Sequence, residues 1–364
     1  STLTEQWDGT NWTEVGDLGT TRNKQAQGGS MTAAVVGFGA IPAHTATAEE
    51  WEFPPITATI RQEGQLYIKD GALKGFEKAG GVPTGTWASG ATVNTGRSNL
   101  FGVGSSNSDG LIYGGESPYK DNTEKYDGTS WTELNDLNTA KRAGAGAGTV
   151  YTAAFCATGI APPGRVTSNE TWDGTSWTEV NDVNTARNSA ASSGSLTAGL
   201  IFAGEAATGD VAVAESWDGT SWTETGDLNT ARSFIAGTGT QTAALAMSGQ
   251  NGPGTTRYTN VEQWDGSSWT EIADVNATRS TAGSSGTVSS ALFFAGEGPS
   301  ISAATEVWNG SSWTEINDLS TARGDTSGLG SGVLALCSGG AAPSLSGATE
   351  EFTADNALAD ITVS

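Results

Sequence analysis

Short runs of alternating polar and apolar residues recur along the chain in one fixed order. A copy begins with Glu-x-Trp-Asp-Gly-Thr-Ser-Trp-Thr-Glu, passes through Asp-Leu-Asn-Thr-Ala-Arg to a segment of small residues, and ends in an apolar run closed by Gly. Seven copies, aligned on the second Trp, fill the chain at intervals of 75, 44, 46, 45, 47 and 44 residues. A period of this length indicates a solenoid, a propeller or an array.

The fifth copy shows what one unit builds. Residues 215–218 and 222–225 predict two short strands around Asp218-Gly219, because Asp-Gly between β-forming residues favours a hairpin. Residues 233–240 predict a strand of small residues, and residues 243–249 predict an apolar strand. Four strands per copy describe a propeller blade. Small residues then suit the crowded inner strand, and Trp suits the outer strands, where blades diverge.

The Trp residues occupy repeat positions, which predicts that they pack between blades. Burying one Trp removes ~150–250 Å² from water, worth on the order of 4–6 kcal/mol as an upper bound. The alternative is an exposed aromatic stripe that stacks sugars. The Trp residues assigned to packing are Trp7, Trp12, Trp131, Trp172, Trp177, Trp217, Trp222, Trp264, Trp269, Trp308 and Trp313.

The composition narrows the classes of partner. The chain has 40 Asp and Glu against 17 Lys and Arg, and binding to a phosphate backbone needs clustered cations. We therefore expect neither nucleic acid nor an anionic membrane surface as a partner. No apolar run approaches the ~18 residues of a membrane span, and no secretory leader is visible. Two Cys do not define a disulfide framework, so buried free thiols are expected.

These repeats resemble the kelch family of β-propellers. The resemblance lies in the Glu-x-(Trp/Tyr)-Asp hairpin, the Trp five residues later, the Arg about ten residues beyond it, and the apolar strand ending in Gly, as in 202–204. It covers nearly the whole chain, although the paired Gly is often single and Trp mostly replaces Tyr. WD40 repeats need a Gly-His step in each blade, and this chain has one His. The Asp-box of sialidases spaces its Asp and Gly differently.

We predict one all-β domain over 1–364, a seven-bladed, kelch-like β-propeller with four-stranded blades. The N-terminal hairpin at 5–15 is expected to pair with the inner strands at 324–340 and so close the ring without an open sheet edge. Residues 350–352 and 361–363 are competing outer strands at the C-terminus. Residues 50–52 and 56–60 compete in the first full repeat.

Two loops of each blade are expected on the same face of the ring. The loop leaving the outermost strand is nearly constant, whereas the loop between the second and third strands differs from copy to copy. Such variation suits a face adapted to a partner, but surface loops also drift where nothing restrains them. The candidate ligand-binding residues in these variable loops are His44, Tyr119, Lys120, Arg165, Asp210, Arg257 and Tyr258.

An Arg closes the constant loop in most copies. A ring of such cations would bind an anion, but the planar, bidentate guanidinium also suits structural contacts with carbonyls or a carboxylate, and we favour that role. The Asp five residues earlier is the expected partner or turn cap. These structural residues are Arg22, Arg97, Arg187, Arg232, Arg279 and Arg323, with Lys141-Arg142 in the third copy.

About 30 extra residues, at 54–86, interrupt the first full repeat. They contain a second Asp-Gly hairpin, with a Gly-x-Leu-Tyr strand and a Leu-x-x-Phe strand, and it resembles short modules of bacteriophage tail-fibre and other virion surface proteins. This hairpin is either a docking element or a neutral decoration. Its candidate docking residues are Tyr67, Lys69, Lys74, Phe76 and Lys78.

The chemistry of most enzyme classes is missing. The single His argues against Ser-His-Asp catalysis and multi-His metal centres. A carboxylate pair that cleaves a glycoside should occur in one blade only, whereas most Asp and Glu of this chain recur in every copy. We expect no enzyme activity, no cofactor and no metal, although residues 106–110 faintly resemble a calcium loop. The leading hypothesis is a binding module on a virion or other extracellular surface that recognises a host glycan or protein and contacts other assembly proteins. A purely architectural protein, or a polysaccharide-cleaving propeller, is the alternative.

Overall fold

The computed structural model describes residues 84–354, except 117, 253–255 and 342–343, and the backbone of separate strands within 4–76 and at 358–360. The chain divides into two compact units, 1–62 and 63–364. Every regular element in the described residues is a β-strand. No helix there is long and apolar enough to span a membrane.

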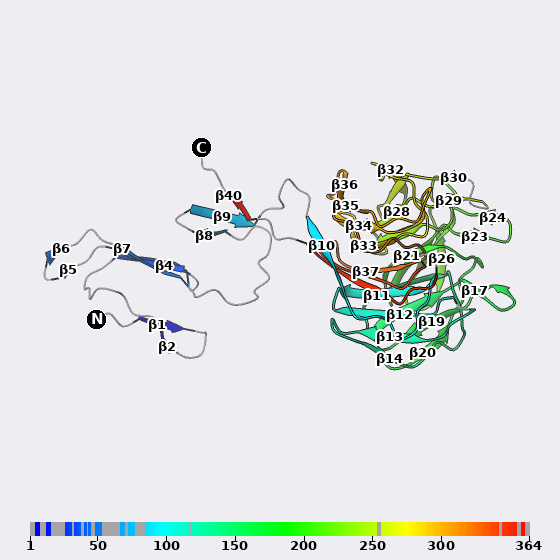
Figure 1. Cartoon of the computed structure of the whole chain (residues 1–364), viewed down its shortest axis with the longest axis horizontal. Helices are drawn as coiled ribbons and strands as arrows, with labels where there is room; N and C mark the ends of the chain where they lie inside the picture. The colour runs from blue at the N-terminus through cyan, green and yellow to red at the C-terminus, as the bar shows by residue number, and fades with distance from the viewer. Residues whose placement is uncertain are drawn as a thin grey trace. The chain divides into compact units, whose positions relative to one another are not determined.

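Six four-stranded antiparallel sheets form the blades of a propeller (Figure 1). Blade 1 contains β11 (Phe101–Ser106), β12 (Asp109–Tyr113), β13 (Thr123–Tyr126) and β14 (Trp131–Glu133). Blade 2 contains β15 (Ala145–Val150), β16 (Ala153–Ala157), β19 (Asn169–Trp172) and β20 (Trp177–Val180). Blade 3 contains β21 (Ala191–Ser195), β22 (Ala198–Phe202), β25 (Ala214–Trp217) and β26 (Trp222–Thr225).

The other three blades repeat this order. Blade 4 contains β27 (Ala236–Gly239), β28 (Ala244–Met247), β31 (Val261–Trp264) and β32 (Trp269–Ile272). Blade 5 contains β33 (Gly283–Thr287), β34 (Ser290–Phe294), β35 (Thr305–Trp308) and β36 (Trp313–Ile316). Blade 6 contains β37 (Ser327–Gly330), β38 (Leu334–Ser338), β39 (Thr349–Ala354) and β10 (Gly85–Ser89).

The Asp-Gly step makes the turn between the two outer strands. In blade 3 the strands pair Trp217 with Trp222, and Asp218 Oδ1 accepts the backbone N–H groups of Thr220 at 2.8 Å and Ser221 at 2.7 Å. Gly219 has a φ of +91°, a backbone conformation that glycine adopts without steric cost. The hairpin predicted from the sequence therefore forms as expected.

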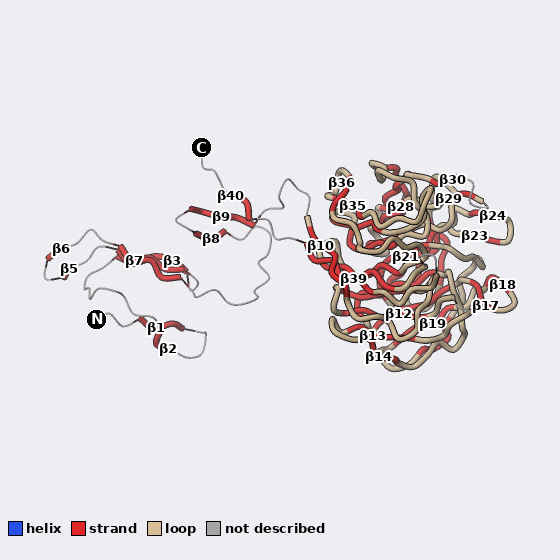
Figure 2. Tube along the Cα trace, viewed as in Figure 1, coloured by secondary structure: helices blue, strands red, loops and turns tan. Residues whose placement is uncertain are grey.

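The ring closes where its first strand, β10, pairs with β39 near its C-terminal end (Figure 2). The two strands pair over five residues. The all-β propeller with four-stranded blades is confirmed, but the prediction of seven blades is wrong, because the ring has six. Closure by the N-terminal hairpin is also wrong. That hairpin, β1 (Thr4–Trp7) with β2 (Trp12–Val15), is a separate two-stranded sheet.

The insertion explains why counting copies overestimates the blades. Within one sequence copy, β7 (Ala48–Glu52) corresponds to the third strand of a blade and β10 to the fourth. The insertion lies between these two strands. β39 repeats the Glu-x-aromatic pattern of β7 and pairs with β10 instead. Trp87 of β10 then lies 5.3 Å from Phe352 and 4.9 Å from Phe294 of blade 5, measured between ring centroids. The copy that contains Trp87 thus completes the last blade.

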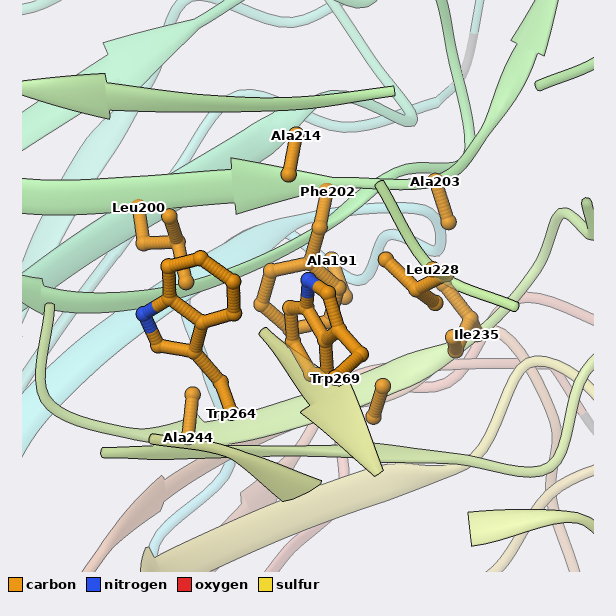
Figure 3. Close-up of a cluster of buried hydrophobic side chains, with 11 residues drawn as sticks. Ala191, Leu200, Phe202, Ala203, Ala214, Leu228, Ile235, Ala244, Trp264 and Trp269 are labelled. Carbon is orange, nitrogen blue, oxygen red and sulfur yellow. The ribbon is translucent and has the colours of Figure 1, made fainter. Parts of the chain in front are cut away.

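The hydrophobic core consists of six clusters, one between each pair of neighbouring blades. Figure 3 shows the cluster in which Leu200 and Phe202 of blade 3 meet Trp264 and Trp269 of blade 4. The rings of Phe202 and Trp269 lie 4.8 Å apart, and both Trp side chains are at most 6% exposed. A surface for stacking sugars needs exposed rings, so these Trp side chains serve packing.

The same burial holds for the other predicted Trp positions within the ring. Each is at most 7% exposed, and they are Trp131, Trp172, Trp177, Trp217, Trp222, Trp308 and Trp313. Trp7 and Trp12 belong to β1 and β2, and their side chains lie outside the described residues.

Several strands outside the ring form small sheets. In the N-terminal unit, β3 (Ala26–Ser30), β4 (Ala33–Gly37) and β7 make one sheet, and β5 (Ala40–Ile41) pairs with β6 (Ala43–His44). In the other unit, the insertion forms β8 (Leu66–Lys69) and β9 (Ala72–Phe76), which pair as a hairpin. β40 (Leu358–Asp360) pairs with β9 and makes this sheet three-stranded.

Candidate functional site

A buried ion pair anchors the beginning of every blade. The cation that ends the constant loop meets the Glu of the third strand of the blade that it precedes, at N–O distances from 2.5 to 3.3 Å. All twelve side chains are at most 3% exposed. These clamp pairs are Arg97–Glu124, Lys141–Glu170, Arg187–Glu215, Arg232–Glu262, Arg279–Glu306 and Arg323–Glu350.

The constant loop supplies further donors to the same carboxylate. Glu262 accepts hydrogen bonds from the backbone N–H and the side-chain amide of Asn229, at 2.7 and 2.9 Å. Burial lowers the pKa of the Arg232 guanidinium, and the charge of Glu262 opposes that shift. The recurring Asn and Arg of this loop are therefore explained by their contact with a buried Glu.

The Asp five residues before the clamp cation, an expected partner, has other contacts. Asp136 accepts the backbone N–H of Thr123, and Asp318 accepts that of Thr305, both at 3.2 Å. These carboxylates cap the start of a third strand. Arg22 lies outside the described residues.

The variable loops lie on the same face as the clamp cations. In every blade, the residue after the clamp cation forms a β-bridge with the first part of the variable loop. The bridged pairs are Ser98–Glu116, Arg142–Ile160, Asn188–Glu205, Ser233–Gln250, Ser280–Glu297 and Gly324–Ala341.

The second residue after each clamp cation forms what we call the mouth ring. Each backbone N–H donates to the carbonyl of the equivalent residue in the preceding blade, at 2.6 to 3.1 Å, and Asn99 donates to Asp325 to close the circle. All six residues have left-handed backbone conformations, with φ between 51° and 54°. The mouth ring consists of Asn99, Ala143, Ser189, Phe234, Thr281 and Asp325.

The mouth ring lines a recess of about 110 Å³. Its lining includes the polar residues Thr281, Asp325 and Asn99 of blades 5, 6 and 1, together with Ser189 and Phe234 of blades 3 and 4. Burial raises the pKa of the Asp325 carboxyl to about 6, and the negative charges of Glu297 and Glu116 add to this effect. A second cavity, of about 280 Å³, is lined only by the inner strands and contains no mouth-ring residue.

A second set of equivalent residues lies in the variable loops, and we call it the loop ring. Every variable loop is closed by a backbone hydrogen bond to the glycine after the second strand, as from Val166 to Gly159 and from Tyr258 to Gly249. The residue before this donor occupies the same place in all six loops. The loop ring consists of Tyr119, Arg165, Asp210, Arg257, Ile301 and Leu345.

The predicted ligand residues in the loop ring reach toward the next blade. Arg165 of β18 (Gly164–Arg165), which pairs with β17 (Ile160–Ala161), forms an ion pair with Glu205 at 2.9 Å. Arg257 of β30 (Thr256–Arg257), which pairs with β29 (Gln250–Asn251), contacts Ser280 at 3.2 Å and Glu297 at 3.6 Å. Both Arg side chains remain about 30% exposed (31% and 28%) and so combine a structural contact with access to solvent.

The other two contacts differ in kind. Asp210 of β24 (Gly209–Asp210), which pairs with β23 (Glu205–Ala206), accepts the backbone N–H of Gly252. Tyr119 lies under the Arg142 guanidinium, 5.5 Å from the ring centroid. The face is thus a set of blade-to-blade contacts rather than six independent loops.

The remaining predicted residues are placed as follows. Lys120 and Tyr258 follow the loop ring directly, and their backbone N–H groups close their loops. His44 ends β6 in the N-terminal unit, and its surroundings lie outside the described residues. The docking candidates Tyr67, Lys69, Lys74 and Phe76 belong to β8 and β9, whereas Lys78 lies outside the described residues.

Sequence reasoning missed the whole mouth ring and two members of the loop ring. Ile301 and Leu345 both lie in loops without a charged or aromatic residue, so residue chemistry does not mark them as candidates. The available signal was positional: the second residue after each clamp cation differs in every copy. Only aligned repeats, and not residue chemistry, would have revealed it.

Two further features concern metal and thiol chemistry. Among the described residues, no three His, Cys, Asp or Glu side chains gather as a metal site. Cys156 and Cys337 are free and fully buried, and burial raises the pKa of the Cys156 thiol to about 12. No protein-family model and no curated protein matches the chain.

Proposed function

We propose that this protein is a non-enzymatic binding module that recognises a glycan or a protein on another surface through the mouth ring and the loop ring. One observation carries the proposal. Twelve side chains occupy equivalent places on a repeated backbone; the six of the mouth ring all differ, and the six of the loop ring are of five types, with Arg occurring twice. At the structural positions of the repeat, most copies hold the same Trp, Asp, Asn, Arg and Glu, with exceptions such as Tyr126, Lys141 and Phe352.

Backbone strain in the mouth ring supports a functional role for its side chains. A left-handed conformation is uncommon for residues other than Gly, Asn and Asp, and costs of order 1–3 kcal/mol where the surrounding structure imposes it. Ala143, Ser189, Phe234 and Thr281 nevertheless occupy such positions. Random sequence change in a surface loop does not explain a Phe at position 234, whereas an aromatic side chain that lines a recess suits contact with a ligand.

The setting that we propose is a virion or another extracellular assembly. The support is the resemblance of the sequence around β8 and β9, which pair as a hairpin, to short modules of virion surface proteins. A purely architectural role is the second candidate, because this hairpin takes β40 as a third strand and forms a sheet of its own, separate from the six blades. Such a sheet offers contacts to other assembly proteins that do not involve the ring face.

The proposal is tested with labelled full-length protein on a glycan array and on candidate host cells. The informative variant is Phe234→Ala in the mouth ring, and the matched control is Val333→Ala, because Val333 is 42% exposed in a turn between the two inner strands of blade 6. We expect saturable binding that Phe234→Ala weakens and Val333→Ala leaves unchanged. No saturable binding at micromolar protein would refute the binding role, and release of reducing sugar would indicate a polysaccharide-cleaving enzyme.

A further inference from the structure

Two exposed apolar side chains lie next to each other in the loop ring. Ile301 of blade 5 is 36% exposed, and Leu345 of blade 6 is 42% exposed. Val150 and Val333 are the other large apolar side chains with comparable exposure in the described residues, and both lie at the opposite end of the blades, beside the turns after β15 and β37. On the face of the variable loops, the large apolar side chains with the highest exposure in the described residues therefore belong to blades 5 and 6.

Three cations on this face already pair with carboxylates. The cations Arg142, Arg165 and Arg257 meet Glu116, Glu205 and Glu297, respectively, at 2.8 to 3.6 Å. In this part of the face, Asp325 of blade 6 makes no ion pair with any described residue. It lines the mouth recess, belongs to the same blade as Leu345, and donates its backbone N–H to Thr281, which belongs to the blade of Ile301.

We infer that the ligand is a protein segment that inserts a Lys or Arg side chain into the mouth recess, beside Asp325, and rests a neighbouring apolar side chain on Ile301 and Leu345. This inference depends on the proposed binding function and specifies its ligand. The inferred ligand makes two contacts: a charged contact in the recess at the propeller axis, and an apolar contact at the variable loops of blades 5 and 6.

Charge favours a cation in the recess over a neutral group. Asp325 experiences the negative charges of Glu297 and Glu116, and the nearby Arg142 already forms an ion pair with Glu116. An ammonium or guanidinium group would supply the missing opposite charge, and its hydrogen bond to a carboxylate would be charge-assisted. The mouth ring also places Asn99 beside Asp325, and its Nδ2 already donates to Glu116, so its side-chain oxygen can accept a second hydrogen bond from the ligand.

The size of the recess favours the end of a side chain. A cavity needs about 10–15 Å³ for one water, so about 110 Å³ admits a small group and a few waters. Phe234 also lines the recess, and an aromatic side chain there suits contact with the same cation or with the alkyl chain that carries it. A flexible Lys or Arg chain reaches such a recess from the surface, while the backbone of the partner stays above the loops.

The test uses full-length protein and a library of nine-residue peptides with one fixed central Lys, measured by fluorescence anisotropy. We expect bound peptides to carry an apolar residue close to the Lys. Asp325→Asn should lower affinity by about tenfold to a hundredfold, the range for a lost charge-assisted hydrogen bond. Asn is tolerated at this position, because Asn99 has the same backbone conformation in blade 1.

A second variant and a control separate the two contacts. Leu345→Ser should lower affinity about threefold to tenfold, whereas Val333→Ser, at the same 42% exposure on the opposite face, should change it less than twofold. Exchange of the central Lys for Gln should reproduce the loss seen with Asp325→Asn, and the two changes together should add little.

The outcomes distinguish this inference from the proposed function. If glycans bind, Phe234→Ala weakens that binding and Asp325→Asn does not change it, then the inferred protein ligand is wrong but the proposed binding function stands. Peptide binding that Asp325→Asn and Leu345→Ser leave unchanged would overturn the placement of the ligand. Absence of any ligand on the face would refute both.

Discussion

The clamp pair of blade 4 provides a quantitative test of what holds a blade in place. Glu262 is 1% exposed and accepts three hydrogen bonds: from Arg232 at 3.1 Å and from the backbone and side chain of Asn229. Glu262→Gln keeps the shape of the side chain, removes its charge, and turns one acceptor into a donor. The fully buried guanidinium of Arg232 then loses its counter-charge.

The size of the effect follows from what remains around Arg232. Removing one partner of a buried ion pair costs about 3–5 kcal/mol in the free energy of unfolding. Arg232 still donates to the carbonyls of Asn260 at 2.8 Å and Ala246 at 3.3 Å, so the lower end, about 3 kcal/mol, is expected. For a protein of this size, about 2–4 °C of Tm corresponds to each kcal/mol, which gives a decrease of about 6–12 °C.

Differential scanning calorimetry of the purified protein measures this decrease. The control is Glu271→Gln, because Glu271 is paired with Glu262 in the same sheet but is exposed on the outermost strand. We expect the control to change Tm by less than about 2 °C, as surface substitutions usually stay within ~0.5 kcal/mol.

A double variant tests the electrostatic reason directly. In Glu262→Gln with Arg232→Met, the uncompensated charge is gone, and apolar replacement of a buried pair is often neutral. The double variant should therefore be more stable than Glu262→Gln alone. If the two are equally unstable, or if Glu262→Gln matches Glu271→Gln, the clamp is not the contact that holds the blade.

Three further predictions concern closure, titration and the thiols. Trp87 is partly buried against Phe294 and Phe352, so Trp87→Ala should lower the unfolding free energy of the ring by about 3 kcal/mol, the lower end for a Trp, whereas Trp12→Ala should leave the ring transition unchanged; equal effects would contradict closure of the ring through β10. Because the pKa of Asp325 rises from 3.8 to about 6 on folding, the folded state binds more protons between these values, so its contribution to stability is present below pH 4 and is lost as pH rises through 6. Asp325→Asn should therefore raise Tm at pH 7.5 and not at pH 3.5, and a pH-independent effect in thermal melts would refute this assignment. Cys156 and Cys337 should not react with a thiol reagent at pH 8 until urea unfolds the ring, and rapid reaction of the native protein would show that the blades open locally.

The local parts of the fold were determined by the sequence alone. The Asp-Gly turns, the small-residue inner strands and the buried Trp follow from a few adjacent residues, and the repeat period shows that each unit packs against its neighbours. The recurring Arg makes the structural contact that the sequence predicts, but its partner is a Glu about 30 residues later and not the Asp five residues earlier, as Arg232 and Glu262 show. Contacts at that distance depend on how strands pair and not on spacing.

Only the tertiary structure decided the blade number and the binding face. β7 and β39 carry nearly the same third-strand pattern, and which of them pairs with β10 is a non-local choice between sequences of similar local preference. The mouth ring arises because residues about 45 positions apart converge on one axis and bond to each other in a circle. Side chains such as Phe234 and Asp325 show no periodic pattern of their own. Their shared position appears only when the six blades surround the axis.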